Sequence, residues 1–87
     1  MVMAKQQRSR ATAIRLGEEI QRRMELFGKT FDELSLETQI VKSRLHRYAH
    51  GESLKWIDPD ELEAIATALH TTVAELLKAA GYRLTST

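Results

Sequence analysis

Several features that mark other classes of protein are missing from this chain. It has no cysteine, which excludes disulfide bonds and thiolate chemistry and is typical of proteins in a reducing cytoplasm. No apolar run approaches the ~18 residues of a membrane span, and the basic start MVMAKQQRSR leads into no hydrophobic signal segment. The sequence therefore predicts an intracellular protein with no membrane association.

Proline and glycine are also scarce, with one proline and four glycines among 87 residues. A hydrophobic content of 43% and a charged content of 29% are typical of a folded, helix-rich chain and not of a disordered or fibrous one. The length is sufficient for one hydrophobic core and too short for two. We therefore expect a single domain of the all-α class.

Acidic residues are absent from two segments of a chain whose net charge is only +1. Residues 1–15 hold four bases and no acid, and residues 42–50 hold three Lys/Arg and two His and no acid. Residues 51–87, in contrast, hold six acids against three bases. A charge run is usually a solvated face, so the positive segments need a structural context before they indicate a polyanionic partner.

Apolar spacing and end signals predict three helices in the first part of the chain. Apolar residues at intervals of three and four predict a helix over residues 12–27, which ends at a glycine. Thr30 and Glu33 form a capping-box pattern, which predicts a short helix over 31–37. A third helix is expected over 42–50, again ended by a glycine.

Two further helices are expected in the second part of the chain. Asp58 as N-cap and Pro59 at the first helical position are a strong start signal. Thr72 and Glu75 form a second capping-box pattern before the last helix. Between helices three and four, apolar side chains of the connection are expected to fold back on the core: Leu54, Trp56 and Ile57.

The chain is thus divided into three parts. Residues 1–11 are polar, basic and without apolar period, and we expect a flexible N-terminal arm. Residues 12–82 are expected to form the helical domain, and residues 83–87 a C-terminal tail.

The second and third predicted helices are short and are joined by three or four residues, which is the arrangement of a helix-turn-helix. In DNA-binding proteins of this kind the second helix of the pair enters the major groove. At 100° per residue, the helix over 42–50 has Leu45, Tyr48 and Ala49 on one side. Its polar residues lie on the other side or flank it: Lys42, Ser43, Arg44, His46, Arg47 and His50. An outer face without acids avoids repulsion by phosphates.

From LGEEIQRRMELFGKTFDEL through SRLHRYAHG to ELEAIATALHTTVAELLKAAGY, the chain resembles the Xre/Cro family of helix-turn-helix regulators, which includes phage repressors and Cro proteins. The resemblance covers about residues 14–82. It implies a compact, lambda-repressor-like domain of five helices, with helices two and three as the DNA-binding motif. It also implies a dimer on a near-palindromic operator.

Four positions depart from the pattern of that family. Phe31 replaces the usual Gln that contacts phosphate, and Ser35 replaces a small Ala. Gln39 stands where the turn usually has Gly, so it either adopts a left-handed conformation at some cost or the turn has another shape. Val41 replaces a common Ser, which leaves the third helix without a side-chain cap.

The family resemblance assigns base readout to Lys42, Ser43, Arg44 and Arg47. We expect Arg44 and Arg47 to be the main readers because guanidinium groups donate to guanine O6 and N7, whereas Lys42 either reads guanine or holds phosphate. The alternative is that either arginine only pairs with Glu37 or another acid. Contacts to the DNA backbone are assigned to another group: Lys29, Thr30, His46 and His50.

Neither a metal nor a cofactor is expected. His46 and His50 lie one turn apart, but the sequence has no third ligand beside them and no HExxH pattern. Paired carboxylates, a nucleophile with its base and a glycine-rich phosphate loop are also missing, so we do not expect an enzyme or a small-molecule substrate.

The basic N-terminal segment allows two interpretations. Lys5, Arg8 and Arg10 could enter the minor groove as an arm, or they could form a solubilising tail.

The sequence as a whole predicts a sequence-specific, double-stranded-DNA-binding transcription regulator of the phage Cro or immunity-repressor type, in a bacterial cytoplasm. A homodimer is expected through apolar residues of the last helix and tail: Leu76, Leu77, Ala80, Tyr82 and Leu84. The alternatives are an antitoxin-type regulator that also binds a toxin, and a helix-turn-helix module that binds a protein and no DNA.

Overall fold

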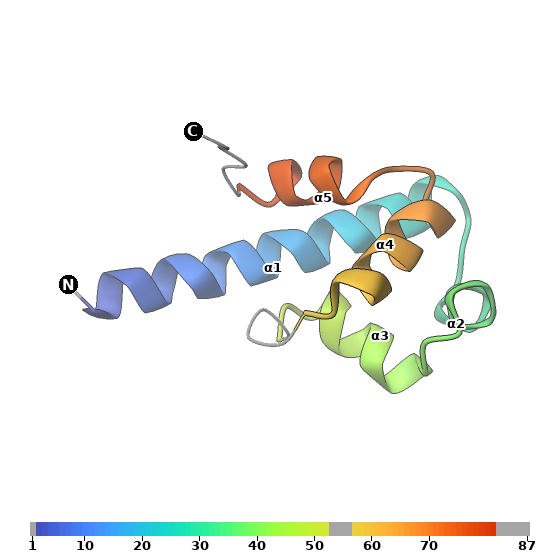
Figure 1. Ribbon diagram of the computed structural model, residues 1–87, viewed down its shortest axis with the longest axis horizontal. Helices are drawn as coiled ribbons and strands as arrows, with labels where there is room; N and C mark the ends of the chain where they lie inside the picture. Colours follow the sequence, from blue (N-terminus) through green and yellow to red (C-terminus); the bar gives the residue numbers. More distant parts are fainter. Residues whose placement is uncertain (1, 53–56, 82–87) are drawn as a thin grey trace.

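The computed structural model describes residues 2–52 and 57–81, with side chains from residue 11 onward. This part of the chain forms five α-helices and contains no strand: α1 Val2–Leu26, α2 Phe31–Thr38, α3 Lys42–Ala49, α4 Pro59–Ala68 and α5 Val73–Ala79 (Figure 1). The predicted all-α, five-helix domain is confirmed. No helix within the described ranges is both long enough and apolar enough to cross a bilayer.

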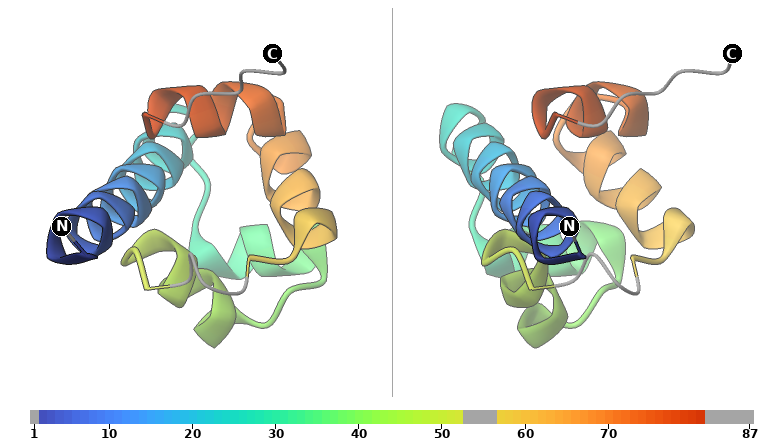
Figure 2. Two further views of the ribbon diagram at one scale, coloured as in Figure 1. Left: turned by 60° about the vertical axis from the view of Figure 1, so that its left-hand side comes forward. Right: turned by 90° about the vertical axis from the view of Figure 1, so that its left-hand side faces the viewer.

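The long helix α1 is the axis around which the others pack. It contacts α3 on one side and α5 on another, while α4 contacts both α2 and α5. Figure 2 shows α5 on the opposite side of the molecule from the α2–α3 pair, with α4 connecting the two levels. The helix-turn-helix therefore lies at one end of the fold, away from α5.

Helix α1 begins at Val2, whereas the sequence predicted a flexible arm over residues 1–11 and a first helix from about residue 12. Its first turns extend beyond the other helices (Figure 1). Residues 2–11 contain neither Gly nor Pro and are rich in Ala, Lys, Gln, Arg and Met, which are strong helix formers. Apolar periodicity detects only the part of a helix that packs against a core, so it missed this extension.

The predicted start signals are confirmed at three helices. Thr30 Oγ1 accepts a hydrogen bond from the backbone N–H of Glu33 at 3.1 Å, and Glu33 Oε1 accepts one from the Thr30 N–H at 2.9 Å. At α4, the Asp58 carboxylate accepts from the backbone N–H of Asp60. At α5, the Thr72 hydroxyl accepts from the backbone of the third helical residue. Each cap satisfies a donor that the first helical turn leaves unpaired.

Side chains from all five helices meet in one core. The cluster consists of Leu16, Ile20, Met24, Leu34, Ile40, Leu45, Tyr48, Leu62, Ile65, Ala66, Leu69, Leu76 and Ala80. Ile57 packs against it as expected, whereas Leu54 and Trp56 lie outside the described residues.

The burial of α5 corrects the predicted dimer surface. Leu76 and Ala80 have no exposed surface in the monomer, so neither can contact a second copy without unfolding α5. A seven-residue helix has a single apolar face, and α5 uses that face to cover α1 and α4. Leu77 is partly buried against the same core, and Tyr82 and Leu84 lie outside the described residues.

Candidate nucleic-acid interface

The end of α3 is fixed by a close contact with α1. A Cβ added at Gly17 would lie 2.3 Å from the carbonyl oxygen of Ala49 and 2.8 Å from that of Tyr48, so only glycine allows the two backbones to approach this far. Beside it, Gln21 Nε2 donates to the Ala49 carbonyl at 2.8 Å. Helix α1 thus caps one of the free carbonyls in the last turn of α3 and sets its position.

The turn between α2 and α3 replaces glycine with a left-handed glutamine. Gln39 has φ 62° and ψ 26°, which is the first of the two alternatives that the sequence left open. Two hydroxyls hold the next residue: Ser35 Oγ donates to the Ile40 carbonyl at 2.6 Å, and Thr38 Oγ1 accepts from the Ile40 N–H at 3.2 Å. The backbone polar groups of buried Ile40 are therefore both satisfied.

Helix α3 has the two faces that its sequence predicts. Leu45, Tyr48 and Ala49 are buried, whereas Ser43 and Arg47 are exposed on the opposite side. Helix α3 has Val41 as its N-cap residue and no side-chain cap, also as predicted, and Val41 is 64% exposed. The polar face of α3 therefore points away from the core.

Arg44 is held to α4 by an acid that the sequence did not single out. Its Nε donates to Glu61 Oε1 at 2.7 Å, and the Tyr48 hydroxyl donates to the same oxygen at 2.9 Å. The Tyr48 oxygen in turn accepts the backbone N–H of Asp58 at 3.2 Å. The pairing alternative thus holds for Arg44, with Glu61 as its partner in place of Glu37.

This network changes the acidity of its members in the directions that burial and charge dictate. The pKa of Tyr48 is raised above 10.0, first because burial disfavours the phenolate and second because Glu61 is bound to its hydroxyl. The hydrogen bond to Glu61 likewise raises the pKa of Arg44. The phenol and the guanidinium both stay protonated at neutral pH.

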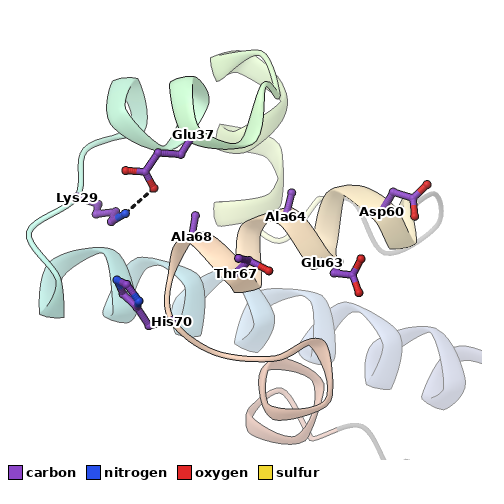
Figure 3. Close-up of a pocket in the computed structure, with 8 residues that line it drawn as sticks. All are labelled: Lys29, Glu37, Asp60, Glu63, Ala64, Thr67, Ala68 and His70. Atoms are coloured by element: carbon purple, nitrogen blue, oxygen red, sulfur yellow. Dashed lines mark hydrogen bonds and ion pairs between the residues drawn. The ribbon is translucent and has the colours of Figure 1, made fainter.

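Two lysines assigned to DNA also have carboxylate partners. Lys42 Nζ lies 2.7 Å from Asp32 Oδ1, and both side chains are largely exposed, at 51% and 76%. Lys29 pairs with Glu37 (Figure 3). Asp32 and Glu37 both lie on α2, so the charge of the motif is much more balanced in space than the acid-free run of α3 indicates.

Phe31 and the two histidines form a stack on the α2–α3 pair. The Phe31 ring lies on His46 with centroids 4.0 Å apart, and the His46 and His50 centroids are 5.9 Å apart. Phe31, which stands where a phosphate-binding Gln is usual, therefore packs against the third helix. Among the described residues there is no group of three or more potential metal ligands, at these histidines or elsewhere.

An open groove of about 560 Å³ lies between α2 and α4, on another side of the motif. Figure 3 shows that Glu37, Asp60 and Glu63 contribute carboxylates to its lining, whereas Lys29 is tied to Glu37. Phosphate would be repelled by these acids, one of which is already paired with Lys29.

Sequence reasoning missed three residues of this region. Gly17 has a detectable signal, because an isolated glycine inside a helical pattern often marks a close approach of two backbones. Asp32 and Glu61 have no such signal, because their partners lie 10 and 17 residues away in the chain.

Two short helices joined by a tight turn, the second with a buried apolar face and an exposed polar face, define a helix-turn-helix DNA-binding domain. Residues 19–80 match the Cro/C1-type HTH DNA-binding domain, and the chain belongs to this family. A search of curated proteins found no significant match. Neither did a search of solved structures.

Proposed function

We propose that the protein is a sequence-specific transcription regulator of the phage Cro or immunity-repressor type, which acts in a bacterial cytoplasm and reads an operator with α3. The observation that carries this proposal is the exposed face of α3, where Ser43 and Arg47 lie opposite the buried Leu45, Tyr48 and Ala49. No acid lies between residues 42 and 50, so the helix can approach phosphates without repulsion from its own side chains.

The residues of this face would have distinct roles. Arg47 and Ser43 lie near its centre and would contact base edges, with Lys42 and Arg44 at its borders. Arg44 would read a base only if its guanidinium served Glu61 and the DNA together, or left Glu61. Contacts to phosphates would come from a further set: Lys29, Thr30, His46 and His50.

The N-terminal part of α1 would contact the DNA backbone and not the minor groove. Lys5, Arg8 and Arg10 belong to a helix, and an α-helix with its side chains is about 10–12 Å wide. The minor groove of B-DNA is only about 6 Å wide. A helical segment therefore cannot enter it as an extended arm does.

Useful affinity would require two copies of the chain. One recognition helix touches few base pairs, so we propose a homodimer on two half-sites. Because Leu76 and Ala80 are buried, the surface for a second copy would include Leu77 or residues outside the described part, such as Tyr82 and Leu84.

The test is selection of binding duplexes from a random library, followed by a mobility-shift titration. The expected result is a preferred sequence that binds at least about 10³-fold more tightly than an unrelated duplex. Affinity for both duplexes should fall steeply as salt is raised. Equal and weak binding to every duplex would reject sequence-specific regulation.

An antitoxin-type regulator is the second candidate, because one exposed apolar residue suits a protein partner. Leu36 is 82% exposed on the outer face of α2. Burial of this side chain against a protein partner would be favourable. Pull-down of a single protein encoded beside the gene, lost on Leu36→Asp but not on Arg47→Ala, would favour this candidate.

A further inference from the structure

Three cations assigned to DNA contact have acids as partners within the chain. Lys29 pairs with Glu37, Lys42 with Asp32 and Arg44 with Glu61. Each pair joins two different segments of the fold, so none of the three is an incidental contact between neighbours on one helix. The DNA-binding face therefore carries less net positive charge than its sequence indicates.

The Lys42–Asp32 pair is the one that a duplex would meet most directly. Lys42 is the first residue of α3, and Asp32 lies in the first turn of α2, with 76% of its side chain exposed. Glu61, in contrast, is shared with Tyr48 and only 23% exposed, and Glu37 faces the groove beside α4. Asp32 is thus the acid in the best position to act on bound DNA.

The geometry places a negative charge close to whatever Lys42 binds. The Asp32 oxygen is 2.7 Å from the Lys42 nitrogen, so a phosphate bound by the same ammonium would lie roughly 6 Å from the carboxylate. An ammonium has three N–H donors, so Lys42 can keep Asp32 while it donates to a guanine. A neutral base edge suffers no such repulsion, whereas a phosphate does.

We propose that Asp32 is a specificity-determining residue, which holds the Lys42 ammonium toward the bases and weakens the attraction of α3 to the backbone of any duplex. The inference rests on the proposed function, because it concerns how the same face reads DNA. Non-specific binding depends almost entirely on phosphate attraction, so it loses most from this carboxylate. Specific binding keeps its base contacts and loses little.

The experiment compares Asp32→Asn with the wild type on the selected operator and on an unrelated duplex of equal length. Removal of the charge should tighten non-specific binding about threefold at moderate salt, from Coulomb repulsion across roughly 6 Å of water. The plot of log affinity against log salt should become steeper by about 0.9. Without the carboxylate, Lys42 can neutralise one more phosphate, which releases one more counterion from the DNA. The ratio of specific to non-specific affinity should fall by a similar factor.

Two control variants separate this role from bulk charge and from helix stability. Glu75→Gln makes the same change in net charge on α5, at the opposite side of the molecule (Figure 2), and should leave both affinities unchanged. Asp32→Glu keeps the charge and should keep the wild-type salt slope. Circular dichroism at the assay temperature verifies that each variant is folded.

The possible outcomes distinguish a failure of the role of Asp32 from a failure of the proposed DNA-binding function. If the wild type binds neither duplex, the proposed function fails and the role of Asp32 fails with it. If the wild type binds the operator specifically but Asp32→Asn leaves the specificity ratio unchanged, the inference alone is overturned.

Discussion

If α3 reads DNA as proposed, we expect base recognition to depend most on Arg47. It lies on the exposed face of α3, opposite the buried Leu45 and Tyr48. A guanidinium group can donate two hydrogen bonds to one guanine. Arg47→Ala should cost about 1 to 3 kcal/mol in operator binding and relax specificity at one base pair. Mobility-shift titrations against operators substituted at each position measure both effects.

The matched control for that substitution is Lys78→Ala on α5, which removes one positive charge far from α3. It should leave operator binding nearly unchanged, because charges beyond about 10 Å are screened at moderate salt. Equal losses in the two variants would mean that Arg47 contributes only net charge and reads no base.

Gly17 allows the backbone of α1 to lie close to the end of α3 because it has no side chain. Gly17→Ala would place a methyl group 2.3 Å from the Ala49 carbonyl oxygen, and the two backbones would have to separate. Overpacking against backbone atoms should cost about 2 to 3 kcal/mol and the gain in helix propensity returns about 1 kcal/mol, so we expect a net destabilisation of about 1 to 2 kcal/mol. Thermal unfolding followed by circular dichroism should show a lower Tm.

Glu18→Ala is the control at the next position of α1. Glu18 is exposed, so this substitution should change the Tm little. A Gly17→Ala variant as stable as the wild type would show that α1 and α3 can move apart at no cost.

At the scale of elements, the contact between α3 and α4 makes stability depend on alkaline pH. The pKa of Tyr48 is higher in the folded protein than its ordinary value of 10.0. The protonated phenol therefore stabilises the fold fully below about pH 10, and this contribution is lost as the pH rises through the folded pKa. Ionisation would place a second negative charge against Glu61.

Comparison of the wild type with Tyr48→Phe isolates this group, because other side chains titrate alike in both proteins. The variant loses hydrogen bonds to Glu61 and to the Asp58 N–H, so it should be less stable at neutral pH. The difference in the free energy of unfolding should stay constant up to about pH 10 and shrink as the pH rises from there toward about 12. A difference that urea titrations find constant over this range would contradict the coupling.

Most elements of this fold could be predicted from local signals, because caps and apolar spacing act over a few residues. Thr30, Asp58 and Thr72 mark the helix starts that the structure confirms. The start of α1 could not be predicted in this way, because residues 2–10 continue the helix by propensity and without an apolar pattern. The partner of Arg44 depended on how α4 packs, which no local pattern records.

For the whole molecule, the proposed dimer sets the form of the operator. If two copies bind one face of a duplex, their α3 helices must meet successive major grooves about 34 Å apart. Selected operators should then be near-palindromes with half-sites about 10 base pairs apart. A selected site without internal symmetry, bound by a single copy in sedimentation experiments, would contradict the dimer.

The distribution of charge in space is the property of the whole molecule that its sequence predicts least well. A run of bases without acids, residues 42–50, indicated an unopposed positive face. Folding brings Asp32 and Glu61 to that face from α2 and α4. Electrostatic expectations drawn from a linear sequence therefore describe which charges exist and not which of them are neutralised by packing.

The turn at Gln39 has a consequence for how such a domain can diversify. The amide and carbonyl of Ile40 find their partners in Ser35 and Thr38, within the same few residues. The hydrogen bonds of this turn are therefore local, and none of them involves a side chain on the outer surface of α3. If α3 reads DNA as proposed, substitutions of Ser43 or Arg47 would alter the recognised sequence and leave these bonds of the turn intact.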